Sequence, residues 1–177
     1  MSDNSEILRK ASRIKLAVFD VDGVLTNGGI ILGATGEEHK VFHAHDGLGL
    51  TMLKRSGCEV AIISSRTSKI VTNRMTDLGI IHVYQGQADK RIAMLAILRE
   101  LNIEKADAAY TGDDLVDIPA MKQSGFAIAV ANAHALVKKQ ADWITENCGG
   151  AGAGREVCEL ILRAQGKLDT AFSDYLR

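Results

Sequence analysis

The sequence has one proline, few aromatic residues and no long apolar run. Of its 177 residues, 5% are aromatic, 46% are hydrophobic and 24% are charged. This composition excludes collagen-like, disordered and coiled-coil chains, so we expect residues 1–177 to form a single globular domain. The longest apolar runs have the length of a strand rather than of a membrane span, and the N-terminal segment is charged where a signal peptide would be apolar. We therefore expect a cytoplasmic protein with no membrane partner.

The chain also lacks an excess of charge of one sign, and it lacks paired cysteines. The net charge is −1, so no basic field is available to hold a nucleic-acid backbone, and we expect no nucleic-acid partner. Cys58, Cys148 and Cys158 lie far apart and form neither a CxxC pair nor a zinc-finger spacing. Such sparse cysteines are typical of reduced thiols in the cytosol.

Short apolar runs alternate with segments of helical periodicity along most of the sequence. We expect strands at 16–19, 60–63, 81–84, 108–110 and 126–130, and helices at 47–55, 68–78, 90–101 and 118–123. This alternation predicts an α/β fold, a Rossmann-like parallel sheet with helices on both faces. Ligands bind such sheets at the carboxyl ends of the strands, so the polar residues that follow the strands are predicted to meet there.

Two segments depart from the alternation. Residues 27–45 are predicted to form a β-hairpin, with strands at 30–32 and 38–43 around a Gly-Ala-Thr-Gly turn. Residues 149–154 are rich in glycine and precede an amphipathic helix at 155–165. A dinucleotide site is disfavoured there, because the glycines do not follow the GxGxxG spacing and no βαβ unit comes after them. We expect a loop that positions the last helix.

Two acidic clusters follow predicted strands. Asp20 and Asp22 come after the first strand, and Asp113, Asp114 and Asp117 come after the strand at 108–110. Either cluster alone is also typical of a turn or of a helix cap. Carboxylates brought together at one edge of a sheet are unfavourable unless a cation separates their charges, and an oxygen ligand set suits Mg²⁺. The sequence therefore predicts a shared site for a divalent cation, with Mg²⁺ as the ion.

A lysine and a serine add to this edge of the predicted sheet. Lys90 opens a predicted helix, where the helix dipole disfavours a cation, so we expect an anion nearby; a solvated surface lysine is the alternative. Ser64 follows the strand at 60–63 and offers hydroxyl and amide groups to an oxyanion. With an aspartate as nucleophile, these residues suit phosphoryl transfer through an aspartyl-phosphate.

Four segments resemble the four motifs of haloacid dehalogenase-like phosphohydrolases in order and context: DVDGVLT at 20–26, IISS at 62–65, Lys90, and GDDLVD at 112–117. The resemblance implies that Asp20 is the nucleophile and a Mg²⁺ ligand. It implies that Asp22 is the general acid and base, with a backbone carbonyl that also binds the metal. The remaining implied roles are a third metal ligand at Asp113, supporting residues at Asp114 and Asp117, and phosphoryl contacts from Ser64 and Lys90.

Segments outside the four motifs are similar to family members that hydrolyse an eight-carbon keto-sugar acid phosphate in lipopolysaccharide precursor synthesis. The similarity lies in the hairpin, in FHAHDGLG at 42–49 and in the glycine-rich loop. It implies substrate binding by His43, His45, Asp46, Gly47, Thr51, Arg66, Arg74 and Arg155. Many relatives carry arginine where this chain has His45, and a histidine holds an anion only when protonated. A nine-carbon keto-sugar acid phosphate, or a broad set of sugar phosphates, is the alternative substrate.

Too little chain lies between the motifs for a separate cap domain. The resemblance implies a homotetramer instead, in which hairpins associate and the C-terminal tail at 149–177 contacts a neighbouring subunit. The loop Gly149–Gly154 and Arg155 would then close the neighbour's site. The exposed edges of an isolated hairpin favour association independently.

Alternatives of a different kind are a signalling receiver domain, an inactive scaffold and a transition-metal site. A receiver also combines acidic residues, a hydroxyl, a lysine and Mg²⁺, but its acidic pair and its phosphorylated aspartate lie on different strands. A scaffold is disfavoured because every catalytic position is filled. His39, His43 and His45 share a strand face by parity, yet no cysteine or acidic ligand set lies beside them in the sequence.

Overall fold

A six-stranded parallel sheet forms the centre of the molecule. The computed structural model describes residues 3–173 and 175–177. The strands run in the order β5-β4-β1-β6-β7-β8. Their bounds are β1 (Leu16–Phe19), β4 (Glu59–Ile63), β5 (His82–Tyr84), β6 (Ala108–Gly112), β7 (Phe126–Ala129) and β8 (Trp143–Ile144). The predicted α/β fold is therefore confirmed, with a short sixth strand, β8, that the sequence analysis does not predict.

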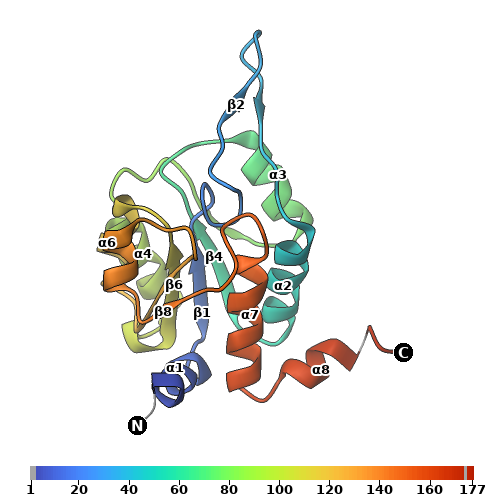
Figure 1. The fold of residues 1–177 in the computed structure, drawn as a ribbon, viewed down its shortest axis with the longest axis vertical. Coiled ribbons are helices and arrows are strands. Elements are labelled where there is room, and N and C mark those ends of the chain that lie inside the picture. The colour runs from blue at the N-terminus through green and yellow to red at the C-terminus, as the bar shows by residue number, and fades with distance from the viewer. Residues whose placement is uncertain (1–2, 174) are drawn as a thin grey trace.

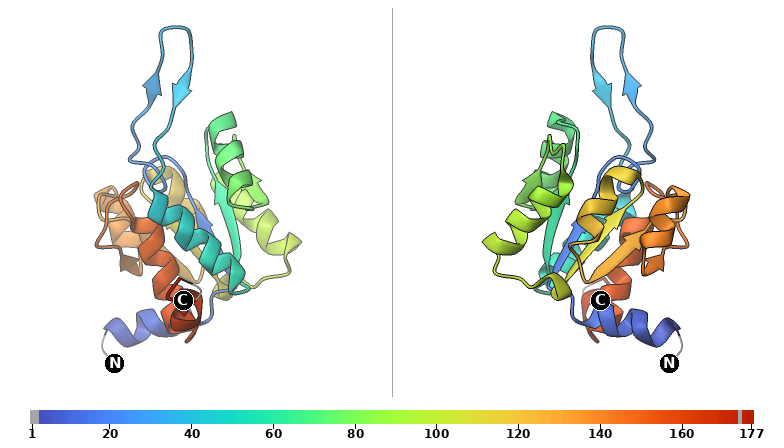
Figure 2. Two further views of the ribbon diagram at one scale, coloured as in Figure 1. Left: turned by 90° about the vertical axis from the view of Figure 1, so that its right-hand side faces the viewer. Right: turned by 90° about the vertical axis from the view of Figure 1, so that its left-hand side faces the viewer.

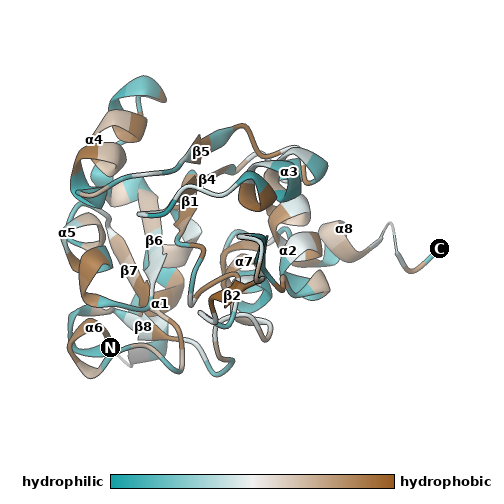
Figure 3. Ribbon diagram, turned by 90° about the horizontal axis from the view of Figure 1, so that it is seen from above, coloured by the Kyte–Doolittle hydropathy of each residue, from teal (hydrophilic) through white to brown (hydrophobic). Residues whose placement is uncertain are grey.

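Helices cover both faces of the sheet, as the apolar strands require (Figure 3). One face carries α2 (Ala44–Arg55), α3 (Lys69–Asp77) and α7 (Ala153–Ala164), and the other carries α4 (Lys90–Glu100), α5 (Ile118–Met121) and α6 (Ala135–Gln140). The N-terminal helix α1 (Asp3–Ser12) packs against α7. Helix α8 (Leu168–Ser173) follows α7 near the C-terminus. Two 3₁₀ turns, Lys105–Asp107 and Leu115–Asp117, flank β6. The sequence analysis predicts neither α1 nor α6 nor α8.

The register of the sheet brings the predicted site residues to one edge. Phe19, the last residue of β1, pairs with Ile62 of β4 and with Thr111 of β6. The residues that follow these three strands therefore emerge side by side at the carboxyl edge of the sheet. This is the edge at which α/β sheets bind ligands.

A β-hairpin rises from the same edge and stands clear of the body (Figures 1 and 2). It consists of β2 (Ile31–Leu32) and β3 (Glu38–His39), and Gly36 forms its turn with a φ of +94°. The hairpin predicted at 27–45 is confirmed, but its second strand ends at His39 rather than at His43, because the ladder with β2 pairs only Glu38 and His39. Among the described residues, the chain between β1 and β4 forms only this hairpin and α2, with no separate cap domain.

No helix among residues 3–173 and 175–177 is long and apolar enough to cross a membrane.

Candidate active site

Asp20 and Lys90 form the centre of the site. Asp20 follows β1 and Lys90 is the first residue of α4, and both side chains are buried. Lys90 Nζ lies 2.8 Å from Asp20 Oδ1 and 2.7 Å from Asp117 Oδ1. Burial alone would lower the pKa of Lys90, but the two facing carboxylates raise it. The anion expected beside Lys90 is thus a pair of aspartates, and the lysine is a buried cation rather than a solvated one.

Asp117 is fully engaged by hydrogen bonds. Its Oδ1 accepts from Lys90 and from the hydroxyl of the buried Tyr110, at 2.8 Å. Its Oδ2 accepts from the backbone N–H groups of Asp113 and Asp114 at 3.0 and 3.1 Å. Asp117 therefore fixes the loop after β6. Asp114 caps the following 3₁₀ turn with its own Oδ1, which accepts from the N–H of Leu115.

The carboxylates of Asp20, Asp113 and Asp117 are close enough to share a cation, with one oxygen from each lying within 4.8 Å of the others. Burial, and then the charge of Asp117, raises the pKa of Asp113 to about 7. Burial is also the main reason that the pKa of Asp20 rises to about 7, against the opposing charge of Lys90. Carboxylates held this close without enough positive charge retain protons, and a divalent cation reverses that tendency.

Two observations indicate which aspartates would bind Mg²⁺. Asp113 Oδ1 is buried without a hydrogen-bond partner, whereas both oxygens of Asp117 are already occupied. Gly23 allows Asp113 to approach the loop after β1, because a Cβ at Gly23 would lie 2.0 Å from Asp113 Oδ2. The structure therefore fits Mg²⁺ held by the carboxylates of Asp20 and Asp113, with Asp117 behind them.

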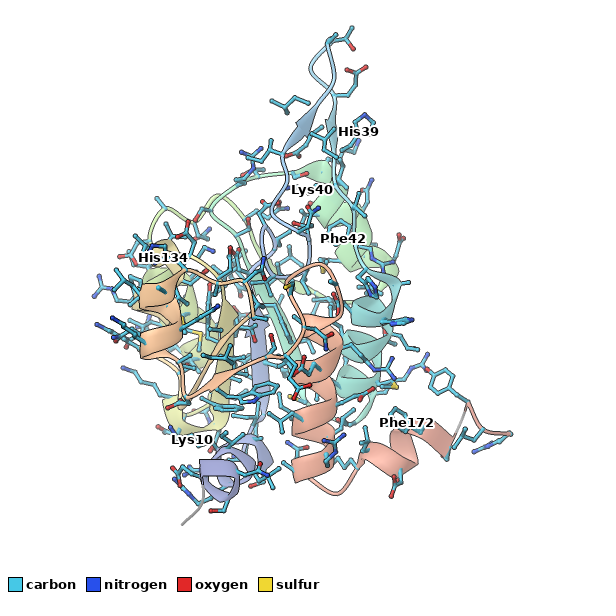
Figure 4. All side chains as sticks on the ribbon, viewed as in Figure 1. Lys10, His39, Lys40, Phe42, His134 and Phe172 are labelled. Atoms are coloured by element: carbon cyan, nitrogen blue, oxygen red, sulfur yellow. The ribbon has the colours of Figure 1, made fainter. Side chains whose placement is uncertain are left out.

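The side chain of Asp22 points toward the base of the hairpin rather than into the carboxylate cluster. Its Oδ1 is hydrogen-bonded to Lys40 Nζ, and its Oδ2 lies 3.8 Å from Arg66 Nε. Glu38 joins this group, with Oε1 at 2.9 Å from Arg66 Nη2 and 3.5 Å from Lys40 Nζ. Figure 4 labels Lys40 at the foot of the hairpin, above the carboxyl ends of the strands.

Ser64 lies at the end of β4, beside β1, and is buried. Its hydroxyl accepts from the N–H of Arg66 at 3.2 Å, and its carbonyl accepts from the N–H of Gln87 at 3.0 Å. These bonds tie the end of β4 to the loop that leads into Lys90. Ser64 is therefore at the expected edge, and Arg66 on the same turn is half exposed.

The predicted substrate residues divide into two groups. Arg66 lies beside Asp22, as described, while His43, His45, Asp46, Gly47 and Thr51 are on or next to α2. Thr51 donates its hydroxyl to the carbonyl of Gly47 at 2.9 Å, within the helix. Arg74 of α3 crosses α2 at Gly47, where a Cβ would lie 2.2 Å from Arg74 Nη2, and its guanidinium is 6.0 Å from the ring centre of Phe42.

Asp46 connects α2 to the last long helix. Its Oδ1 accepts from the backbone N–H of Arg155 at 2.8 Å, near the start of α7. Two nearby atoms, Oδ2 of Asp46 and Nδ1 of His43, are buried without hydrogen-bond partners among the described residues. Burial raises the pKa of Asp46. The Asp46 carboxylate thus supports the packing of α2 against α7.

The glycine-rich loop packs against the loop that follows Asp22 in its own chain. A Cβ at Gly149 would lie 1.7 Å from the carbonyl oxygen of Gly23, and a Cβ at Gly150 would lie 2.3 Å from the backbone nitrogen of Asn27. Arg155 pairs with Glu159, and α7 is buried along one face. Residues 149–164 thus pack within their own chain, and α8 also lies against it, with the Phe172 ring centre 5.7 Å from the guanidinium carbon of Arg155.

Sequence reasoning missed Lys40 and Tyr110. Tyr110 lies in an apolar strand, where its hydroxyl gives no local sign of the aspartate seven residues later. Lys40 directly follows a short strand that Glu37 precedes. Charged residues at both ends of a short strand are typical of a solvated sheet edge. Parity also groups His39, His43 and His45, but the structure places only His43 and His45 together, with ring centres 4.8 Å apart. The carboxylate cluster contains none of these histidines.

The chain is similar to known proteins of one family. A family model of haloacid dehalogenase-like hydrolases matches residues 61–152. The chain is 48% identical to 3-deoxy-D-manno-octulosonate 8-phosphate phosphatase of Salmonella typhi over 168 residues, which are 95% of this chain and 89% of that protein. It is 46% identical to the Yersinia pestis phosphatase of the same name over 166 residues, 94% of this chain and 89% of that protein.

Solved structures with the same arrangement include two that hold metal ions. The phosphatase of Moraxella catarrhalis, in complex with magnesium, phosphate and a KDO molecule, matches with a TM-score of 0.94 and 46% identity, covering 97% of this chain and 98% of that one. The cobalt-bound deoxy-D-mannose-octulosonate 8-phosphate phosphatase of Haemophilus influenzae matches with a TM-score of 0.90 and 39% identity, covering 95% and 99%.

Proposed function

This chain belongs to the haloacid dehalogenase-like hydrolases, and we propose that it hydrolyses 3-deoxy-D-manno-octulosonate 8-phosphate to the free sugar acid and phosphate. The reaction is that of a Mg²⁺-dependent phosphatase in lipopolysaccharide precursor biosynthesis. The observation that carries this conclusion is the group formed by Asp113 and the buried pair of Asp20 and Lys90 at the carboxyl edge of the sheet. It is supported by the match, over nearly the whole chain, to a phosphatase structure that contains magnesium, phosphate and KDO.

Asp20 and Asp22 divide the chemistry between them. A carboxylate oxygen of Asp20 forms a bond to phosphorus while the bond from phosphorus to the sugar oxygen breaks, and Asp22 gives its proton to that oxygen. Asp22 then takes a proton from water, whose oxygen attacks the aspartyl-phosphate and releases phosphate and free Asp20. Asp22 suits both steps because it lies two residues from Asp20, outside the carboxylate cluster, and one of its oxygens has no hydrogen-bond partner among the described residues.

The other site residues favour the ionised form of Asp20 and hold the phosphoryl group. Lys90 contacts one oxygen of Asp20 and favours its charged form. Ser64 and Lys90 are the proposed donors to the phosphoryl oxygens, whose charge they balance as the transition state forms. Asp20, Asp113 and the backbone carbonyl of Asp22 would hold Mg²⁺, which would supply electrostatic stabilisation of the phosphoryl charge.

Phosphate release from a panel of phosphates tests the substrate. We expect the wild-type protein with Mg²⁺ to show a kcat/KM for the eight-carbon keto-sugar acid phosphate that exceeds the value for the nine-carbon acid phosphate by about tenfold or more, since an added carbon is discriminated by roughly this amount. Hexose phosphates serve as the comparison set. Equal hydrolysis of all of them would keep the phosphatase and overturn the assignment of the eight-carbon acid. A preference for the nine-carbon acid would replace that assignment.

The hairpin supports a homo-oligomer, and we infer a homotetramer built on it. Four apolar side chains on or beside the hairpin are half exposed or more, namely Ile30, Ile31, Leu32 and Val41. A ladder of two residue pairs is marginal alone, and an exposed apolar edge strand invites pairing with another chain. In this assembly, the C-terminal tail at 149–177 is proposed to contact a neighbouring subunit.

Replacing Leu32 by glutamate is expected to convert the oligomer to smaller species, because a charge would then lie at the apolar contact between hairpins. Analytical ultracentrifugation measures the change. The matched control is Ile92→Glu, which places the same charge at an exposed isoleucine of α4, away from the hairpin. If the Leu32→Glu and Ile92→Glu variants both sediment as the wild type does, the hairpin does not form the contact between subunits.

Two further properties complete the proposal. A cytoplasmic location is supported by three cysteines that are all free thiols, two of them buried. The substrate contacts are proposed for Arg66 beside Asp22, for the group on α2 with Arg74, and for Arg155. The departure at His45 leaves the carboxylate of the sugar acid to the arginines, since a guanidinium remains charged at every physiological pH.

A further inference from the structure

Lys40, a buried lysine of the hairpin, contacts the carboxyl group of Asp22, the proposed general acid and base. Lys40 comes directly after β3, yet its side chain is only 1% exposed. Burying an ammonium group is costly unless anions replace its water. Two carboxylates do so here: Asp22 Oδ1, which is hydrogen-bonded to Lys40 Nζ, and Glu38 Oε1, at 3.5 Å. Lys40 is therefore held in place as part of the site rather than solvated at an edge.

The contact is asymmetric within the Asp22 carboxyl group. Lys40 occupies Oδ1, whereas Oδ2 is buried and has no hydrogen-bond partner among the described residues. Arg66 Nε lies 3.8 Å from Oδ2, beyond hydrogen-bond distance, and the Arg66 side chain is 44% exposed. One oxygen is thus fixed by a buried cation, and the other is free to give or take a proton.

We propose that Lys40 is a positioning residue that fixes the Asp22 carboxyl group through Oδ1 and leaves Oδ2 for proton transfer. The proposal rests on the function assigned to Asp22 above. Lys40 touches neither the phosphoryl group nor Asp20 in this account, and it acts through Asp22 alone. Lys40 belongs to the hairpin. An interaction that orders the base of the hairpin therefore also orders the side chain of Asp22, the general acid and base.

Leaving groups of different acidity separate this role from a general loss of structure. An alkyl oxygen, as in the sugar acid phosphate, needs a proton to leave, whereas p-nitrophenolate leaves without one. We expect Lys40→Met to lower kcat/KM for the eight-carbon acid phosphate by about 10- to 100-fold and to change kcat/KM for p-nitrophenyl phosphate by less than about threefold, since general acid catalysis is worth this much or more. Lys40→Arg, which keeps the cation, is expected to recover part of the loss.

A double mutant tests whether Lys40 works through Asp22. Asp22→Asn should show the same selective loss, and Asp22→Asn combined with Lys40→Met should be no slower on the eight-carbon substrate than Asp22→Asn alone. Lys54→Met is the matched control, because Lys54 binds the carbonyl of Gly79 at the surface and should leave both substrates unaffected. Circular dichroism and thermal unfolding verify that each variant is folded.

Three outcomes would overturn the proposal. They are equal losses on both substrates by Lys40→Met, no loss on either, and losses that multiply in the double mutant. Failure of the proposed function has a different signature, because the wild-type protein itself would then show no preference for the eight-carbon acid phosphate or release no phosphate from it.

Discussion

Replacing Asp20 by asparagine is expected to abolish phosphate release. The side chain is the proposed nucleophile, and an amide of the same size cannot form the aspartyl-phosphate. We expect kcat to fall by on the order of 10⁴-fold or more, as for the loss of other catalytic nucleophiles. The fold should persist, because asparagine fills the same buried space and Lys90 keeps its bond to Asp117. Steady-state phosphate release measures the loss, and circular dichroism with sedimentation verifies the fold and the oligomer.

Asp107→Asn is the matched control for this substitution. Asp107 is also a largely buried aspartate paired with cations, Arg13 and Lys15, but it lies at the opposite end of β6 from the site. Its replacement should leave kcat within about twofold of the wild-type value, as for a change that touches no group of the reaction. An Asp20→Asn protein that turns over at the wild-type rate would remove Asp20 as the nucleophile.

Replacing Lys90 by methionine is expected to cause a large loss of stability in the absence of metal. Methionine leaves the buried carboxylates of Asp20 and Asp117 without the cation that lies between them. Removing one partner of a buried ion pair costs about 3–5 kcal/mol of unfolding free energy, a large part of the total for a domain of this size. Urea unfolding in the presence of a chelator measures the change.

The control for Lys90→Met is the same substitution at a surface ion pair. Lys10 pairs with Asp142 at 2.6 Å, and both side chains are about a quarter to a third exposed. Lys10→Met should therefore cost no more than about 1 kcal/mol. Equal stability of the two variants would show that Lys90 does not balance the carboxylate cluster. Adding Mg²⁺ should restore more stability to Lys90→Met than to Lys10→Met, because the ion supplies the missing positive charge.

Much of the fold could be predicted because its signals are local. The strands that flank the site are short apolar runs, and each ends at a polar loop, so their carboxyl edge and its aspartates could be placed without coordinates. The elements that were missed, such as α1, α6 and β8, are short or carry mixed charge, and tertiary packing rather than periodicity defines them. The second strand of the hairpin was predicted too long for a similar reason, since β-type alternation continues past the residues that are paired.

The contacts that complete the site depend on distant parts of the chain. Lys40 and Asp22 are eighteen residues apart in the sequence. Tyr110 and Asp117 are brought together by the turn after β6, which forms only in the folded chain. The packing of Gly149 and Gly150 against the loop after Asp22 could not be predicted from the sequence either. A glycine indicates that another part of the backbone comes close, but the sequence does not show which part. Sequence patterns place residues at an edge, whereas the pairing of their side chains needs the fold.

Metal-dependent turnover of the eight-carbon keto-sugar acid phosphate is the most direct test of the central claim. Phosphate release by the wild-type protein would be measured with Mg²⁺, with a chelator in place of Mg²⁺, and after Mg²⁺ is returned in excess. We predict turnover with Mg²⁺, its loss with the chelator and its recovery on return of the ion, because Lys90 alone does not balance the clustered carboxylates of Asp20, Asp113 and Asp117. Absence of phosphate release with Mg²⁺, or equal release in the chelator, would contradict the account.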